Sequence, residues 1–259
     1  MKIFEIDEKF MDYTETDFYK KFGDSIFHNS RNSEGEGFVP FTPRRIPKDT
    51  AAAFHQEVNQ LSKQQFGIPV RSLLFALPSE LGAKNISRSG TVYSVYPVSN
   101  DYRIFYAENV VDMTVDLDAT GYDIFRQTQV YVEKLLYEFF QNSDAIDSAL
   151  RQKYINDISK KLDDIVATHE DNKNISWLKE FYDLCFADMK KFLVKLHLGE
   201  DVQDVIEKAF AHSRTHFQNR AYSYVSSLKE VTSREELSEV SKFVEIMVYD
   251  PKGFIFRKI

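Results

Sequence analysis

Hydrophobic residues in the second half of the chain recur at the spacing of an α-helix. Between residues 144 and 168, apolar side chains follow one another every three or four positions: Ile146, Leu150, Tyr154, Ile158, Leu162 and Ile165. This spacing places them on one face of a helix. The same periodicity appears over residues 122–141, 175–198 and 201–228. The pattern therefore predicts a helical segment, residues 121–232, without strands.

The first 120 residues show a different pattern, in which short apolar runs alternate with turn-forming residues. Two helices are expected, over residues 51–66 and 79–87. Short runs of β-branched, aromatic and aliphatic residues predict strands at 70–77, 91–96 and 101–106. Glycines, prolines and asparagines crowd residues 28–50, which favours a loop. Two further stretches are less regular: residues 1–30 predict a short strand followed by one or two short helices, and residues 108–118 fit no single element.

The last 27 residues return to a strand pattern. Ser233 and Glu236 have the spacing of a capping box that opens a short helix. Strands are then expected at 243–249 and 254–259, joined by the Asp250–Gly253 turn. Because an isolated β-hairpin is marginally stable, it needs partner strands from elsewhere in the chain. We therefore expect an α+β fold: a split mixed α/β core domain from residues 1–120, completed by the C-terminal β-hairpin (233–259), with 121–232 as a helical insertion.

Composition narrows the classes of function. The chain has 33 basic and 40 acidic residues, a net charge of −7, which argues against general nucleic-acid binding through phosphates. No run of 18 apolar residues is present, so no membrane span is expected. One cysteine, Cys185, allows no disulfide framework; we expect it to be core filler in a cytoplasmic protein. The nine glycines form no glycine-rich phosphate-binding motif, which excludes Rossmann and P-loop sites.

Three segments carry a resemblance to known proteins. They are Arg44–Thr50, Phe66–Phe75 and Gly90–Pro97, and together they resemble a pattern in uncharacterised proteins of tailed phages. The layout also resembles the ADP-ribosyltransferase fold, in which an early arginine and a serine-bearing strand precede a late glutamate before a Pro/Gly turn. Phe243–Phe256 is similar to that late segment. The resemblance covers roughly residues 40–118 and 240–259, and implies that NAD is a substrate.

Within this resemblance, Glu245 takes the catalytic role, because a fixed carboxylate stabilises the positive charge that develops when the nicotinamide–ribose bond breaks. Arg45 or Arg71 would bind the diphosphate, and Ser72 would support the ribose. An aromatic residue would pack on nicotinamide, with Phe75, Tyr93 and Tyr106 as the choices. The implied function is a phage-type NAD-dependent ADP-ribosyltransferase-like protein that modifies a host protein or other macromolecule in the infected host's cytoplasm.

Other interpretations remain open at this point. The helical segment and the 14% aromatic content also suit a non-enzymatic phage interaction protein, namely an inhibitor of a host factor or defence, or a virion component. The acidic residues between 101 and 118 suggest a third possibility, a metal-dependent nuclease. His212 and His216 share a helix face but have no clear third ligand, so no metal site is expected. Each of the residues assigned a role also has an ordinary structural interpretation, such as a strand-edge ion pair.

Overall fold

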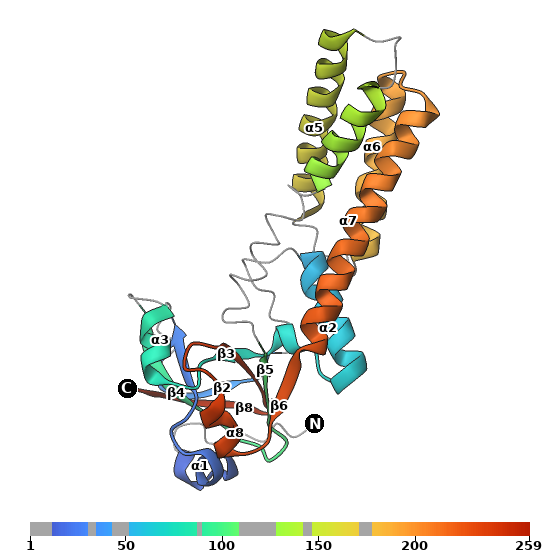
Figure 1. Ribbon diagram of the computed structural model, residues 1–259. Helices are drawn as coiled ribbons and strands as arrows, with labels where there is room; N and C mark the ends of the chain where they lie inside the picture. Colours follow the sequence, from blue (N-terminus) through green and yellow to red (C-terminus); the bar gives the residue numbers. More distant parts are fainter. Residues whose placement is uncertain are drawn as a thin grey trace, which may run out of the picture. The chain divides into compact units, whose positions relative to one another are not determined.

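The computed structural model describes residues 12–30, 35–42, 52–86, 90–108, 128–141, 147–170 and 178–259. The chain divides into two compact units. The sheet unit contains residues 1–46, 62–113 and 224–259, and the helical unit contains residues 47–61 and 114–223. Three separate stretches of sequence thus build the sheet unit, as the colours of Figure 1 show.

The strands of the sheet unit form two antiparallel four-stranded sheets. The first sheet has the order β1-β4-β8-β2, with β1 Phe27–Ser30, β4 Thr91–Pro97, β8 Gly253–Lys258 and β2 Gly37–Pro40. The second has the order β3-β7-β5-β6, with β3 Leu74–Ala76, β7 Ile246–Tyr249, β5 Arg103–Ala107 and β6 Leu228–Val231. Short helical elements complete the unit: η1 Tyr13–Glu15, α1 Asp17–Phe22, η2 Val70–Ser72, α3 Glu80–Ile86 and α8 Arg234–Glu239. Each sheet therefore combines strands from the first 110 residues with strands from the last 32.

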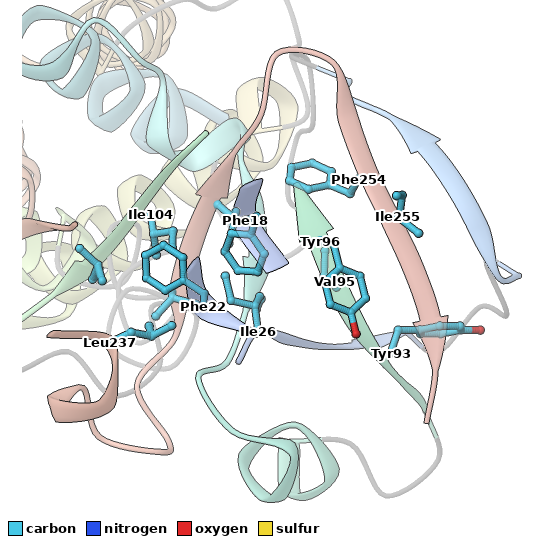
Figure 2. Packing of buried hydrophobic residues seen from close by; sticks show 14 of the residues in the cluster. Phe18, Phe22, Ile26, Tyr93, Val95, Tyr96, Ile104, Leu237, Phe254 and Ile255 are labelled. Carbon is cyan, nitrogen blue, oxygen red and sulfur yellow. The ribbon is translucent and has the colours of Figure 1, made fainter. Parts of the chain in front are cut away.

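The core of the sheet unit takes side chains from both sheets. In the second sheet, Ala76, Ile246 and Val248 join the same buried cluster as Val95 and Phe254 of the first sheet. Figure 2 shows this cluster, closed by aromatic and aliphatic side chains of the short helices. Burying a large aliphatic or aromatic side chain stabilises a fold by about 1.5–3 kcal/mol. The shared core therefore holds the two sheets against each other.

The C-terminal strand–turn–strand is confirmed, and its two strands enter different sheets. β7 lies between β3 and β5, whereas β8 lies between β4 and β2. The connecting turn is fixed by Asp250, a fully buried residue whose carboxylate accepts hydrogen bonds from the N–H groups of Ser99 (2.7 Å) and Lys252 (2.8 Å). Gly253 has a φ of +134°, and a Cβ there would lie 2.4 Å from the Val39 carbonyl oxygen. Only glycine lets the chain pass this closely from one sheet to the other.

Several elements of the sheet unit agree with the sequence pattern, and one region does not. The predicted helix at 79–87 is confirmed as α3, and the strands at 91–96 and 101–106 are confirmed as β4 and β5. The predicted strand at 70–77 is present only in its second half, after the η2 turn. The loop predicted for 28–50 is wrong where β1 and β2 lie, because pairing with β4 and β8 overrides the local preference of turn-forming residues. Residues 1–11 and the ambiguous segment beyond Glu108 lie outside the described residues.

The helical unit follows the predicted periodicity. It contains a helix at residues 128–141, α5 Ser148–Glu170, α6 Leu178–Lys195 and most of α7 Glu200–Ser226. These confirm the helices expected over 122–141, 144–168, 175–198 and 201–228. The helix predicted at 51–66 is α2 Ala52–Phe66, and its residues up to Leu61 group with this unit. Long helices dominate the unit in Figure 1, and Ile158, Leu162 and Ile165 are buried as their spacing predicts.

The chain is therefore a mixed α/β protein with two antiparallel sheets and a helical unit. α7 contributes to both units, since its last residues from Tyr224 belong to the sheet unit. None of the helices among the described residues is long and apolar enough to cross a membrane.

Candidate functional site

A cavity of about 350 Å³ opens in the sheet unit, lined by residues of both sheets. One wall comes from β1, β2 and β8, and the other comes from the η2–β3 segment. The described residues that line it are His28, Val39, Pro40, Phe41, Thr42, Ser72, Leu73, Leu74, Phe254 and Phe256. Most of these side chains are apolar, and three of them, His28, Thr42 and Ser72, supply polar groups beside aromatic rings. Small-molecule sites in proteins typically combine these features.

His28 is held by the opposite wall of this cavity. Its Nδ1 lies 2.8 Å from the carbonyl oxygen of Phe75, and a carbonyl oxygen can only accept a hydrogen bond. Nδ1 therefore carries a hydrogen and donates it to this carbonyl oxygen. The imidazole also packs edge-on against Phe256, with the ring centres 5.8 Å apart. These two contacts fix the orientation of His28 at the cavity wall.

Ser72 and Arg71 are neighbours in η2 that have different surroundings. Ser72 lines the cavity. Arg71 is only 2% exposed, and its guanidinium carbon lies 5.3 Å from the centre of the Phe75 ring. Val70, the first residue of this turn, donates its N–H to the Ser62 hydroxyl at 3.1 Å. The turn therefore places a hydroxyl in the cavity and a charged group in the protein interior.

Arg71 and Glu245 both act on the buried hydroxyl of Tyr224. Burial raises the pKa of Tyr224 well above its ordinary value of 10. The positive charge of Arg71 opposes this rise, and the negative charge of Glu245 adds to it. The Tyr224 hydroxyl donates a weak hydrogen bond to the sulfur of Met247 at 3.4 Å. Because Met247 pairs with Phe75 across β7 and β3, these five residues form one cluster, which we call the Tyr224 cluster.

The residues predicted for NAD binding are thus distributed over two places. Arg71, Phe75 and Glu245 belong to the Tyr224 cluster, whereas Ser72 belongs to the cavity. Tyr93 pairs with His28 across β4 and β1, and its side chain is 2% exposed, in edge-on contact with Phe256. It therefore lies in the core next to a cavity residue. Arg45 lies outside the described residues.

Two residues of this region were missed by sequence reasoning. His28 falls in a stretch whose turn formers predicted a loop, so its place on a strand at the cavity wall gave no sequence signal. Tyr224 lies in a helical pattern and looked like one more core aromatic. Only the fold brings it to Arg71 and Glu245.

The other groups singled out in the sequence have structural surroundings. His212 packs against Tyr131 with ring centres 4.3 Å apart, and burial, together with the charges of Arg220 and His212, lowers the pKa of His216. Cys185 is 1% exposed, and burial raises the pKa of its thiol to about 12, so it is core filler. In the described part of the chain, no three histidine, cysteine or carboxylate side chains gather as a metal site would require. Asp112, Asp116 and Asp118 are not among the described residues.

Comparisons of the chain with protein-family models, with curated proteins and with solved structures gave no match.

Proposed function

We propose that the sheet unit binds a nicotinamide nucleotide, NAD, in the cavity between its sheets, as an ADP-ribosyltransferase-like protein. The observation that supports this proposal is the cavity itself, where His28 and Ser72 stand beside aromatic side chains. Its volume of about 350 Å³ is near the lower end for small-molecule sites, which span about 300–1,000 Å³. This space suits the nicotinamide–ribose half of the dinucleotide better than the whole molecule.

The lining chemistry matches that half of NAD. Phe41, Phe254 and Phe256 offer apolar rings against which a flat heteroaromatic ring can pack. The imidazole of His28 and the hydroxyl of Ser72 are polar groups at the cavity wall that can form hydrogen bonds with a ligand hydroxyl. A ribose presents two adjacent hydroxyls, so a pair of such side chains suits it.

The transfer step itself would follow from the resemblance. The bond between ribose C1′ and the nicotinamide nitrogen breaks, and nicotinamide leaves with the bonding electrons. A nucleophile on the host macromolecule bonds to C1′ and gives up its proton. Glu245 is the carboxylate that the resemblance assigns to stabilising positive charge on the ribose.

A second function, ligand binding or partner binding without catalysis, is favoured by the surroundings of Glu245. Its charge acts on Tyr224 together with that of Arg71. Among the described residues that line the cavity, Glu245 does not appear. A carboxylate that does not line the cavity is poorly placed to stabilise a sugar bound there. This observation favours NAD binding over transfer.

Binding is tested by isothermal titration of the full chain with NAD, nicotinamide and ADP-ribose. His28→Ala should weaken the binding of NAD and ADP-ribose about tenfold, the effect of losing one hydrogen bond of roughly 1.4 kcal/mol, and should leave the binding of nicotinamide, which has no ribose, unchanged. His197→Ala, which changes an exposed histidine of the helical unit, is the matched control and should bind as the wild type does. Equal affinities for the two variants, or no binding by the wild type, would reject the proposal.

Transfer is tested with labelled NAD and lysate of a host bacterium. Incorporation of label that is lost in Glu245→Gln supports the enzyme. Binding of NAD by the wild type without any label transfer supports the second function.

A further inference from the structure

The three aromatic rings that line the cavity differ in how much of their surface remains open. Phe254 and Phe256 of β8 are 4% and 2% exposed, so their rings are enclosed by the core of the sheet unit. Phe41, which follows β2, is only partly buried. A ligand in the cavity therefore reaches the ring of Phe41 more readily than the other two rings.

Contacts from the second sheet and its turn hold the Phe41 ring in place. The ring packs edge-on against Tyr249, the last residue of β7, with ring centres 5.5 Å apart and ring planes at 84°. The N–H of Phe41 donates a hydrogen bond to the carbonyl oxygen of Lys252 at 3.4 Å. In an edge-on pair, Tyr249 covers at most one face of the Phe41 ring. Phe41 therefore offers its other face, in a fixed orientation, to a flat ligand ring.

Thr42 is the next residue, and it also lines the cavity. It is exposed, and its hydroxyl has no hydrogen-bond partner among the described residues. A hydroxyl both donates and accepts hydrogen bonds, so it matches a ligand amide, which has N–H and C=O groups. A ligand carboxylate offers acceptors only, and its charge is costly to move out of water without a positive partner. None of the described lining residues is a lysine or an arginine, so this wall favours an uncharged amide.

We propose that Phe41 and Thr42 are specificity-determining residues of the cavity. Together they select a flat aromatic ring with a carboxamide group over an aliphatic ring or an aromatic carboxylate. The ligand ring stacks on Phe41, and the Thr42 hydroxyl hydrogen-bonds to the amide. This inference rests on the proposed function in taking the cavity as the ligand site, and it assigns the nicotinamide group of NAD to the end of the cavity next to β2.

The selectivity of the wild type is the first test, measured by isothermal titration of the full chain with three small probes. Nicotinamide has both features, cyclohexanecarboxamide lacks the aromatic ring, and nicotinic acid carries a carboxylate in place of the amide. The wild type should bind nicotinamide about tenfold more tightly than cyclohexanecarboxamide, the change expected when one aromatic stacking contact is lost. It should also bind nicotinamide more tightly than nicotinic acid. Equal affinities for nicotinamide and either other probe would overturn the inference.

Variants then assign these preferences to the two residues. Phe41→Leu should weaken nicotinamide binding about tenfold and leave the affinity for cyclohexanecarboxamide unchanged, whereas Phe41→Tyr keeps the ring and should bind both as the wild type does. Thr42→Val keeps the shape without the hydroxyl and should weaken nicotinamide binding about fivefold. Because Thr42 is exposed, this variant serves if Phe41→Leu does not fold. Phe243→Leu is the matched control, since Phe243 is 47% exposed in the same unit and is not among the described lining residues.

The outcomes separate this inference from the proposed function. ADP-ribose lacks nicotinamide, so Phe41→Leu should not change its affinity, in contrast to His28→Ala. Nicotinamide binding that is the same in Phe41→Leu and Thr42→Val as in the wild type would overturn the inference, while NAD binding would still support the proposed function. Selective binding of nicotinamide by a wild type that does not bind NAD would reject the proposed function and support the inference.

Discussion

Each unit of the molecule buries a tyrosine hydroxyl, and the two are accommodated in opposite ways. In the helical unit, the Tyr182 hydroxyl lies 2.8 Å from the Ser213 hydroxyl, which is 2.5 Å from that of Thr128. These three groups are neutral. In the sheet unit, the Tyr224 hydroxyl donates a hydrogen bond to the thioether sulfur of Met247. The charges of Arg71 and Glu245 shift the pKa of this hydroxyl in opposite directions. The first group, which we call the Tyr182 cluster, consists of three neutral hydroxyls, whereas the Tyr224 cluster contains two charged side chains.

The difference separates a polar group that stabilises packing from one that constrains position. Hydroxyl groups that hydrogen-bond to one another can be buried with little loss of free energy, and removing one of them lowers the free energy of unfolding only moderately. Buried charges are expensive, and hydrophobic residues of similar size often stabilise a protein as well or better. A charge balance therefore contributes less to overall stability than to the relative placement of the elements that hold it. Removing a charge near Tyr224 should therefore cost more than removing a hydroxyl near Tyr182.

The largest effect is expected from removing the buried charge of Arg71. Arg71→Met should lower the free energy of unfolding by about 3–5 kcal/mol, because the guanidinium is only 2% exposed and its removal leaves the polar and charged groups around it uncompensated. Urea denaturation followed by circular dichroism measures this loss. A variant within about 0.5 kcal/mol of the wild type, as for a surface substitution, would show that the buried guanidinium is not part of a charged network.

A smaller loss is expected in the hydroxyl cluster. Ser213→Ala removes the group that both other hydroxyls contact, and should cost about 1–3 kcal/mol in the same measurement. Thr215→Ala, on the exposed side of α7, removes a hydroxyl bonded to the Ala211 carbonyl and should cost less than about 0.5 kcal/mol. If Ser213→Ala destabilised the protein as much as Arg71→Met, the distinction between the clusters would fail.

Alkaline pH should also affect both clusters. Burial raises the pKa of Tyr182 to about 12, and it raises that of Tyr224 further. An unfolded tyrosine loses its proton near pH 10, so between pH 10 and 12 the unfolded state binds fewer protons than the folded state. Stability is therefore complete below pH 10 and falls as the pH rises above it. Tyr182→Phe should make the fall less steep in urea unfolding at increasing pH; an unchanged slope would contradict the assignment.

The smallest effect is expected for Arg103, an arginine in an ion pair that is more exposed than Arg71. Arg103 donates two hydrogen bonds to the Glu230 carboxylate, at 2.7 and 2.6 Å, but about a third of each side chain is exposed. Arg103→Met should cost about 0–1 kcal/mol, the usual contribution of surface ion pairs. Added salt should reduce this difference further. A loss equal to that of Arg71→Met would mean that burial is not what distinguishes the two arginines.

Only some residues of the candidate site could be predicted from the sequence. Arg71 and Glu245 were singled out together, and the structure does bring their charges to one place. Ser72 was assigned to the same ligand, but it faces the cavity, because adjacent residues of the 3-10 turn η2 point in different directions around the turn. His28 was missed, since local turn formers around it predicted a loop. Its strand exists because β4 provides a partner.

The sequence alone determined the helical unit and the order of the elements. An amphipathic helix closes its hydrogen bonds within itself, so its spacing of apolar residues is a local signal. Tertiary structure decided the sheets: β7 and β8 are four residues apart, yet they complete different sheets. A strand's hydrogen bonds depend on partners distant in sequence, which no local pattern names. For the same reason, only the folded chain could reveal that one segment serves both the cavity and the buried charges.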